Sequence, residues 1–258
     1  MNFDEIIKAL DEIANPELAT DWDNSGIQIY TGTKEVSKIL IALELTSDVI
    51  KEAKESGVEL IITHHPLYFS PIQKIDNNNI IGKYTIELIK SGISVYASHT
   101  NFDDADGGNN DYIASVLKLS NIRKFDEGFI GTFGELTSAT PLEEVCKYVK
   151  DTMGLTSVNA VGNPKAPIKN IGICTGAGGS SDMIGIAFNH GCDLYITGDI
   201  KYHDAQYALE KGICLIDAGH YGTEKFFVQN MFAQLNDKLH GKVEILASKI
   251  DIDPFTVI

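Results

Sequence analysis

Short apolar runs alternate with segments of helical periodicity along the first half of the chain. Residues 39–45, 58–63 and 93–98 are apolar enough to predict buried strands, whereas 47–56 and 80–90 show the spacing of helices. Buried strands separated by helices of about ten residues are typical of a mainly parallel sheet covered on both faces. The pattern therefore predicts an α/β fold.

The second half of the chain repeats this pattern. Three stretches recur in the same order: 38–41 as 169–173, 57–63 as 191–197, and 92–96 as 212–216. A single match of this kind occurs in any βαβ unit, but three in sequence indicate an internal duplication. We therefore predict one domain, residues 1–258, built from two pseudo-symmetric α/β repeats at approximately 1–124 and 125–258.

Composition and charge narrow the range of partners. The chain has 258 residues, with 21 Lys and Arg against 36 Asp and Glu, and a formal net charge of -15. Such a balance argues against a nucleic-acid surface, which needs basic side chains to replace phosphate counterions. Arg123 is the single arginine, so any bound phosphate has to be held by lysine, backbone amides or metal rather than by a guanidinium fork.

The remaining composition indicates a protein of the cytoplasm. The four cysteines form no C-x-x-C pair, which is typical of reduced thiols in a reducing compartment. The first residues lack the basic and apolar regions of a signal peptide, and no apolar stretch approaches the roughly 20 residues of a membrane span. We expect a soluble, cytoplasmic protein without membrane partners.

In each half, histidines and an acidic residue follow the carboxyl ends of predicted strands. The residues concerned are His64, His65, His99 and Asp103 in the first half, and His220 and Glu224 in the second. Parallel sheets bind ligands outside the carboxyl ends of their strands. Imidazole and carboxylate groups gathered there are suitable ligands for divalent metal ions.

Each motif also has a purely structural interpretation. The His64–His65 pair could be a surface turn, Asp103 a helix cap, and His220 with Glu224 a pair on a helix surface. Their occurrence together at strand ends favours the metal site. Because side chains alternate on an extended backbone, we expect those of His64 and His65 to point apart and to serve two different ions.

Two further segments each have more than one possible role. Asp199 and His203 follow the strand at 191–197, where they could orient a ligand, contact substrate or cap a helix. The glycine-rich loop from Gly176 to Gly179 could present amides to a phosphate or could be a tight turn packed near the metals.

Five motifs together resemble a known family. They are DWDNSG at 21–26, THHP at 63–66, SHTNFD at 98–103, TGD at 197–199 and GHYGTE at 219–224. In their order and across essentially the whole chain, they are similar to the GTP cyclohydrolase I type 2 homologues, the Nif-three-like family, in its short form without a central insertion. The resemblance implies two intertwined α/β repeats with mainly parallel sheets, a dinuclear metal site between the repeats, and assembly as a homohexamer.

The resemblance also implies roles for the candidate residues. The implied metal ligands are His64, His65, Asp103, His220 and Glu224, with two divalent ions per subunit. Zinc, iron and manganese all suit this ligand set. His99, which the family does not usually count as a ligand, is expected to orient a ligand or to touch substrate.

The function implied is that of a metal-dependent hydrolase acting on a small anionic, nucleotide-like substrate, as in the opening of the GTP ring. A pair of divalent ions can activate water and polarise an electrophile. The alternative is a non-enzymatic protein that binds or delivers metal, or a regulatory scaffold. The sequence assigns no catalytic residue.

Overall fold

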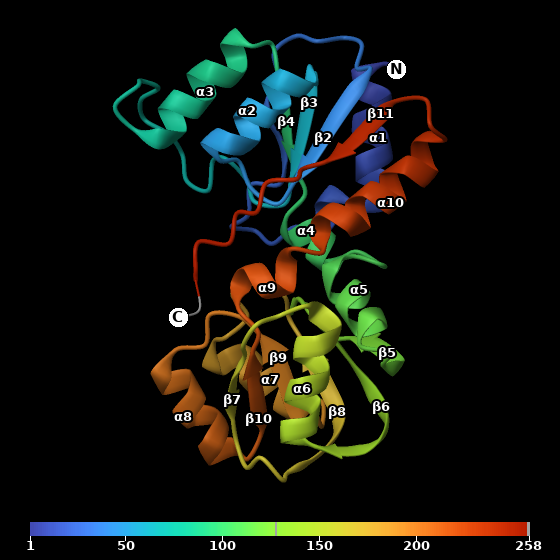
Figure 1. Cartoon of the computed structure of the whole chain (residues 1–258), viewed down its shortest axis with the longest axis vertical. Helices are drawn as coiled ribbons and strands as arrows, with labels where there is room; N and C mark the ends of the chain where they lie inside the picture. The colour runs from blue at the N-terminus through green and yellow to red at the C-terminus, as the bar shows by residue number, and fades with distance from the viewer. Residues whose placement is uncertain (127, 257–258) are drawn as a thin grey trace. The chain divides into compact units, whose positions relative to one another are not determined.

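The computed structural model describes residues 1–126 and 128–256 and divides the chain into two compact units. The first unit comprises Met1–Ala105 and Phe227–Pro254, and the second is built on Asp106–Phe226. The C-terminal helix and strand, red in Figure 1, thus belong to the same unit as the blue N-terminal segments. The chain therefore leaves the first unit, builds the second, and returns to complete the first.

The helices and strands of each unit follow in chain order. The first unit contains α1 (Phe3–Ile13), the 3-10 helix η1 (Pro16–Leu18), β1 (Gly26–Ile29), β2 (Lys38–Ala42), α2 (Ser47–Ser56), β3 (Leu60–Thr63), α3 (Ile80–Lys90), β4 (Ser94–Ala97), α4 (Thr100–Asp104), α10 (Phe227–Leu239) and β11 (Glu244–Ala247). The second contains α5 (Asn109–Val116), β5 (Ser120–Lys124), β6 (Thr132–Pro141), α6 (Leu142–Met153), β7 (Asn159–Val161), β8 (Pro167–Ile173), α7 (Ser181–Asn189), β9 (Leu194–Thr197), α8 (Tyr202–Lys211), β10 (Cys214–Asp217) and α9 (His220–Glu224).

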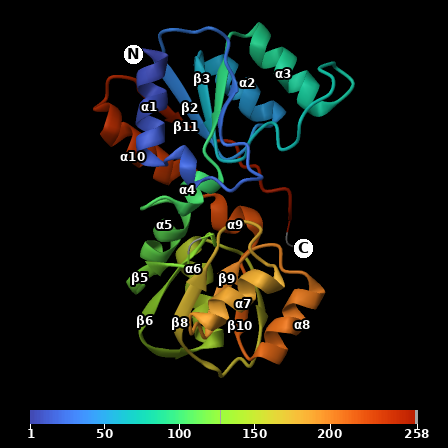
Figure 2. The same cartoon turned by 180° about the vertical axis from the view of Figure 1, so that it is seen from behind.

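The sheet of the first unit has the strand order β1-β4-β3-β2-β11. Its strands are parallel except β1, which pairs antiparallel with β4 at one edge. Leu40, Ile61 and Val95 lie in one buried cluster with residues of α2 and α3. On the opposite face, α1 packs with α10, and the Tyr96 hydroxyl donates to Asp11 of α1 at 3.0 Å. Helices therefore cover both faces, as Figure 2 also shows.

The sheet of the second unit has the order β5-β6-β8-β9-β10-β7. Strands β8, β9 and β10 are parallel, and antiparallel strands flank them on both sides. One buried cluster joins the sheet to α5 and α6, and another joins its opposite face to α7 and α8. The central three strands thus repeat the arrangement of β2, β3 and β4.

The registers bear out the repeated stretches. Leu60 pairs with Ile39 and Ser94, and Leu194 takes the same place between Ile171 and Cys214. The predicted α/β class with mainly parallel, helix-covered sheets is confirmed. In the described residues, no helix combines the length and apolar character needed to cross a membrane.

Candidate metal centre

His64 and His65 lie in a bend directly after β3. The backbone amides of both residues donate to the carbonyl oxygen of Leu43, each at 3.1 Å, and the Thr63 hydroxyl donates to the carbonyl oxygen of His65 at 2.8 Å. Two successive amides that share one acceptor cannot belong to an extended strand. The chain therefore leaves the sheet at Thr63.

This bend corrects the prediction that the two imidazoles point apart. Their ring centroids are 5.2 Å apart, and His64, His65 and His99 each offer a ligand atom within 4.8 Å of the others. The predicted direction was wrong because side chains alternate only while the backbone is extended, whereas the expectation that the two residues serve different ions stays a prediction. The first unit thus gathers three imidazoles in one place.

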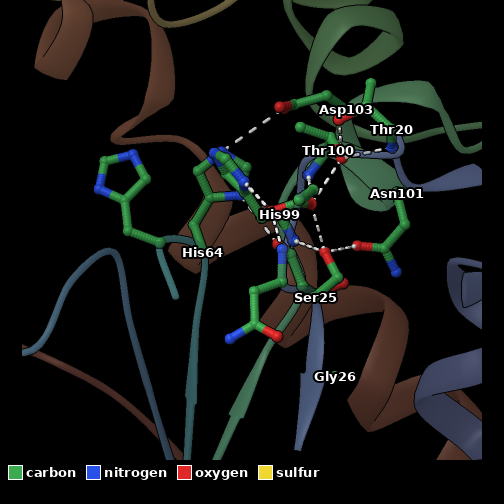
Figure 3. Close-up of polar contacts among 12 residues, drawn as sticks. Thr20, Ser25, Gly26, His64, His99, Thr100, Asn101 and Asp103 are labelled. Atoms are coloured by element: carbon green, nitrogen blue, oxygen red, sulfur yellow. Dashed lines mark hydrogen bonds and ion pairs between the residues drawn. The ribbon is translucent and has the colours of Figure 1, made fainter. Parts of the chain in front are cut away.

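Hydrogen bonds fix which ring nitrogen faces the candidate site. Nδ1 of His64 lies 2.8 Å from the carbonyl oxygen of Ser98, and Nδ1 of His99 lies 2.8 Å from Oδ1 of Asp23. Both oxygens can only accept, so Nδ1 is the hydrogen-bond donor in each ring. Nε2 of His64 lies 3.6 Å from Oδ1 of Asp103, a contact drawn in Figure 3.

The carboxylate of Asp23 is the centre of a dense polar network. Besides His99, it accepts from the Ser25 hydroxyl at 2.7 Å and from the hydroxyl and amide of Thr100 at 2.6 and 3.1 Å. Burial raises the pKa of this carboxyl group, but the hydrogen bonds from His99, Thr100 and Ser25 outweigh it and hold the pKa well below its usual range. Asp23 is therefore an anion that orients the His99 ring.

Asn24 and Ser25 of the 21–26 motif also form hydrogen bonds near His99. The side-chain amide of Asn24 donates to the carbonyl oxygen of Tyr68 at 2.8 Å, and the Ser25 hydroxyl lies 2.9 Å from Oδ1 of Asn101. Figure 3 shows Ser25 beside Asn101 and Thr100. Only the family resemblance points to this motif from sequence, because its partners lie 44 to 77 residues further along the chain.

The second unit holds His220 and Glu224 at the two ends of α9. Nε2 of His220 lies 3.0 Å from Oε2 of Glu224, and Nδ1 lies 2.8 Å from Oδ2 of Asp199. The carboxylate of Asp199 accepts, so Nδ1 of His220 is the donor in this contact. Asp199 has a left-handed backbone, with φ of 58°, in the turn after β9. The contact of Asp199 with His220 is of the kind expected of a residue that orients a metal ligand.

The glycine loop packs tightly against α9. A Cβ atom on Gly176, whose φ is 70°, would collide with Oε1 of Glu224. The amide of Gly176 donates to the Thr223 hydroxyl at 2.9 Å, and that of Thr175 donates to Oδ1 of Asn110 at 2.8 Å. Amides bonded within the protein cannot also bind a phosphate, so these contacts favour the tight-turn interpretation at Gly176.

Two predicted residues have contacts of their own. Nδ1 of His65 lies 3.7 Å from Oε2 of Glu44, beyond hydrogen-bond distance. His203 is exposed in the first turn of α8, where its ring contacts that of Tyr202 at 5.3 Å. The role of His203 toward ligand or substrate stays a prediction.

The donor sets of both units suit divalent metal ions. In His64 and His220, an oxygen acceptor holds Nδ1 while Nε2 faces a carboxylate. Histidines that bind metal usually donate their other nitrogen to a carboxylate or carbonyl in this way. Imidazole and carboxylate ligands together suit zinc, iron and manganese. The protein thus has an α/β fold and side chains that could hold a divalent metal ion.

Comparison with known proteins identifies the family. The sequence model of Duf34/NIF3 (NGG1p interacting factor 3) matches residues 1–254, and the chain belongs to this family. It is 36% identical to the GTP cyclohydrolase 1 type 2 homolog of Clostridium perfringens, with 100% of both chains covered. It is 29% identical to the protein NIF3 homolog of Schizosaccharomyces pombe, over 96% of this chain and 95% of that protein.

Solved structures share the fold. A Staphylococcus aureus hypothetical protein matches with a TM-score of 0.92 and 28% identity, covering 100% of this chain and 99% of the other. A Bacillus cereus protein related to NIF3 matches with the same TM-score at 24% identity, over 100% and 99% of the two chains. The resemblance seen in the five sequence motifs is confirmed.

Proposed function

We propose that the protein binds a pair of divalent metal ions and acts as a hydrolase on a small, nucleotide-like substrate. The observation that carries the proposal is the shared orientation of His64 and His220, whose Nδ1 atoms are anchored to oxygen and whose Nε2 atoms face a carboxylate. The proposed ligands are His64, His65, Asp103, His220 and Glu224.

Divalent ions held by these residues would lower the pKa of bound water and polarise an electrophile. The chain contributes proton handling at His99. Asp23 accepts from Nδ1 of that ring, which leaves Nε2 to exchange a proton with a neighbouring group. Asp199 orients His220 in the same manner from the opposite side of the ring to Glu224.

Charge favours an anionic substrate at such a centre. Two divalent ions bring four positive charges, and Asp103 with Glu224 returns two negative ones. The single arginine is engaged elsewhere, with the guanidinium of Arg123 stacked 4.8 Å from the ring centroid of Phe133. Relatives named GTP cyclohydrolase 1 type 2 homolog support a guanine nucleotide as the first substrate to test.

Metal content tests the ligand assignment. The purified protein, loaded with Mn²⁺, Zn²⁺ or Fe²⁺ and dialysed, is expected to retain two ions per chain by elemental analysis. His65→Ala and Glu224→Ala should each lose most of both ions, because each side chain is a proposed ligand of the ion pair. Glu210→Ala, an exposed position on α8, serves as control. Two ions retained in Glu224→Ala would overturn the assignment.

Turnover tests the hydrolase. The metal-loaded protein is incubated with GTP, and formate and dihydroneopterin triphosphate are followed. Product release that requires metal and fails in Glu224→Ala supports the proposal. Full metal occupancy without turnover on GTP would contradict this substrate and favour the alternative of a metal-binding or metal-delivery protein.

A further inference from the structure

We infer that Trp22 and Phe69 form a stacking surface for a planar aromatic heterocycle beside His99. The inference rests on the proposed function, because it names the part of the substrate that lies next to the candidate metal ligands. All three residues belong to the first unit. We refer to Trp22 and Phe69 together as the aromatic pair.

The aromatic pair is exposed and nearly parallel. Trp22 is 62% and Phe69 55% exposed, although both are large apolar side chains. Their ring centroids are 6.4 Å apart, with planes inclined by only 18°. Exposed apolar surface of this kind often marks a binding site. The two nearly parallel rings present an exposed, flat apolar face that suits a flat ligand.

Both rings also border the candidate metal site. The His99 imidazole stands edge-on to Trp22, with centroids 5.9 Å apart, and edge-on to Phe69 at 5.4 Å. His99 in turn shares the cluster of ligand atoms with His64 and His65. A ring stacked on the aromatic pair would therefore lie close to the polar nitrogens of this cluster.

The backbone around Trp22 is anchored on both sides. The amide of Thr20 donates to the hydroxyl of Thr100 at 3.1 Å, and Asp23 accepts from His99 and Thr100. The indole thus projects from a turn held by the same network that orients the imidazole. Its exposure is not the consequence of a loose loop.

Phe69 is held through its neighbour in the chain. The carbonyl oxygen of Tyr68 accepts from the Asn24 amide at 2.8 Å, and the Tyr68 hydroxyl lies 2.8 Å from that of Thr85. Asn24 is two residues from Trp22, so one motif positions both rings. A preorganised pair loses little conformational freedom when a ligand binds.

A heterocycle suits this surface better than other ligand chemistries. Base stacking on aromatic side chains needs no charge, which suits a chain with a net charge of -15 and a single arginine. The edge of the stacked ring could form a hydrogen bond with the imidazole of His99, because an imidazole has both a donor and an acceptor nitrogen. The single arginine is stacked on Phe133, so affinity from a planar ring compensates for scarce phosphate ligands.

Fluorescence provides a direct test, because Trp22 is the single tryptophan. The probes are guanosine, GTP and inorganic triphosphate, titrated into metal-loaded protein. Guanosine and GTP should quench Trp22 emission, whereas inorganic triphosphate should not. Equilibrium dialysis should show that Phe69→Ala and Trp22→Leu weaken guanosine binding by about tenfold or more, whereas Phe69→Tyr retains it.

Tyr30→Ala is the matched control. Tyr30 is 53% exposed in the same unit and packs on Phe3, with ring centroids 4.9 Å apart. This variant should bind guanosine as the unchanged protein does. Guanosine binding that survives Phe69→Ala and Trp22→Leu, or quenching by triphosphate alone, would overturn the inference.

Two measurements separate the possible failures. If acrylamide cannot quench Trp22 in the free protein, another copy or chain segment already covers the aromatic pair, and the inference is overturned. Metal content and turnover are measured on the same samples. If the protein retains its ions and turns over substrate, but guanosine binding does not depend on the aromatic pair, this inference alone is overturned. If guanosine binds through the aromatic pair but the protein shows no turnover, the proposed hydrolase alone is overturned.

Discussion

Nδ1 of His99 donates to the carboxylate of Asp23 at 2.8 Å, and this bond connects the turn before β1 to the segment after β4. In the second unit, Asp199 holds His220 at the same distance. The two aspartates do not occupy equivalent places, since Asp23 precedes the first strand of its sheet and Asp199 follows β9. The same carboxylate–imidazole arrangement has therefore been built from different positions in the two units.

Asp23→Asn tests whether this carboxylate orients His99. The side chain of Asp23 is fully enclosed and accepts several hydrogen bonds, so the neutral amide should lower the free energy of unfolding by about 2 kcal/mol. Loss of the Nδ1 anchor should also weaken metal binding or turnover by about 10- to 100-fold. Chemical denaturation and competition with a chelator measure the two effects.

Asp21→Asn supplies the control, because Asp21 is exposed in the same turn. It removes the same charge without touching the network and should leave both quantities unchanged. Equal losses in the two variants would show that charge, rather than orientation of His99, is responsible.

Gly176→Ala tests the contact between the glycine loop and Glu224. The new methyl group would collide with Oε1 of Glu224, so we expect the carboxylate to shift and metal retention to fall. The left-handed backbone adds a penalty of about 1–2 kcal/mol to folding. Gly191→Ala carries that penalty alone, because φ is 76° and the space around it is open. Elemental analysis of both variants should show metal loss in Gly176→Ala only.

Local pattern predicted the elements of the first unit well. The helices expected at 47–56 and 80–90 are α2 and α3 with the same bounds. Their first turns are fixed by side chains next to them in sequence, since Thr46 accepts from the amide of Val49 and Asn79 from that of Gly82. Signals of this kind lie within a few residues and can be identified from sequence.

The sequence could not reveal which residues orient the candidate ligands. Asp23 and His99 are 76 residues apart, and nothing in the periodicity of either segment indicates their contact. The bend at His64 was missed for a related reason, because the shared acceptor is the carbonyl of Leu43. The aromatic pair was also missed, since exposure of Trp22 depends on where the chain folds. Candidate ligands were visible from sequence, but the residues that orient them required the fold.

Thiol reactivity provides a third prediction. Cys146 is partly exposed on α6, whereas Cys174, Cys192 and Cys214 are buried. Burial raises the pKa of Cys146 above its usual value and that of Cys192 to about 12. Because the thiolate is the reactive form, iodoacetamide near neutral pH should modify the native protein slowly and at Cys146 only. Mass spectrometry of peptides identifies the site.

Cys146→Ser should abolish the native reaction, and the denatured protein should react at all four cysteines. Rapid alkylation of Cys192 in the native protein would contradict its burial beneath the second sheet.

Glu59 should make stability depend on pH in the acid range. Its carboxylate accepts from the Ser37 hydroxyl at 2.8 Å and from the amides of Ser37 and Lys38 at 3.1 and 2.9 Å. Burial alone would raise the pKa of Glu59, but these hydrogen bonds lower it. Because the folded-state pKa lies below the unfolded value of about 4.3, the stabilisation is present above that pH and is lost as pH falls through the folded value.

Glu59→Gln keeps the size of the side chain and removes its charge. We expect it to lower the free energy of unfolding by up to about 1 kcal/mol at neutral pH. The difference from the unchanged protein should shrink as pH falls below the unfolded value of about 4.3 and through the lower folded value. Urea denaturation at several pH values measures it, with Glu55→Gln on the exposed surface of α2 as control. A difference that stays constant from pH 7 to the acid range would show that the Glu59 carboxylate is not preferentially ionised in the folded protein.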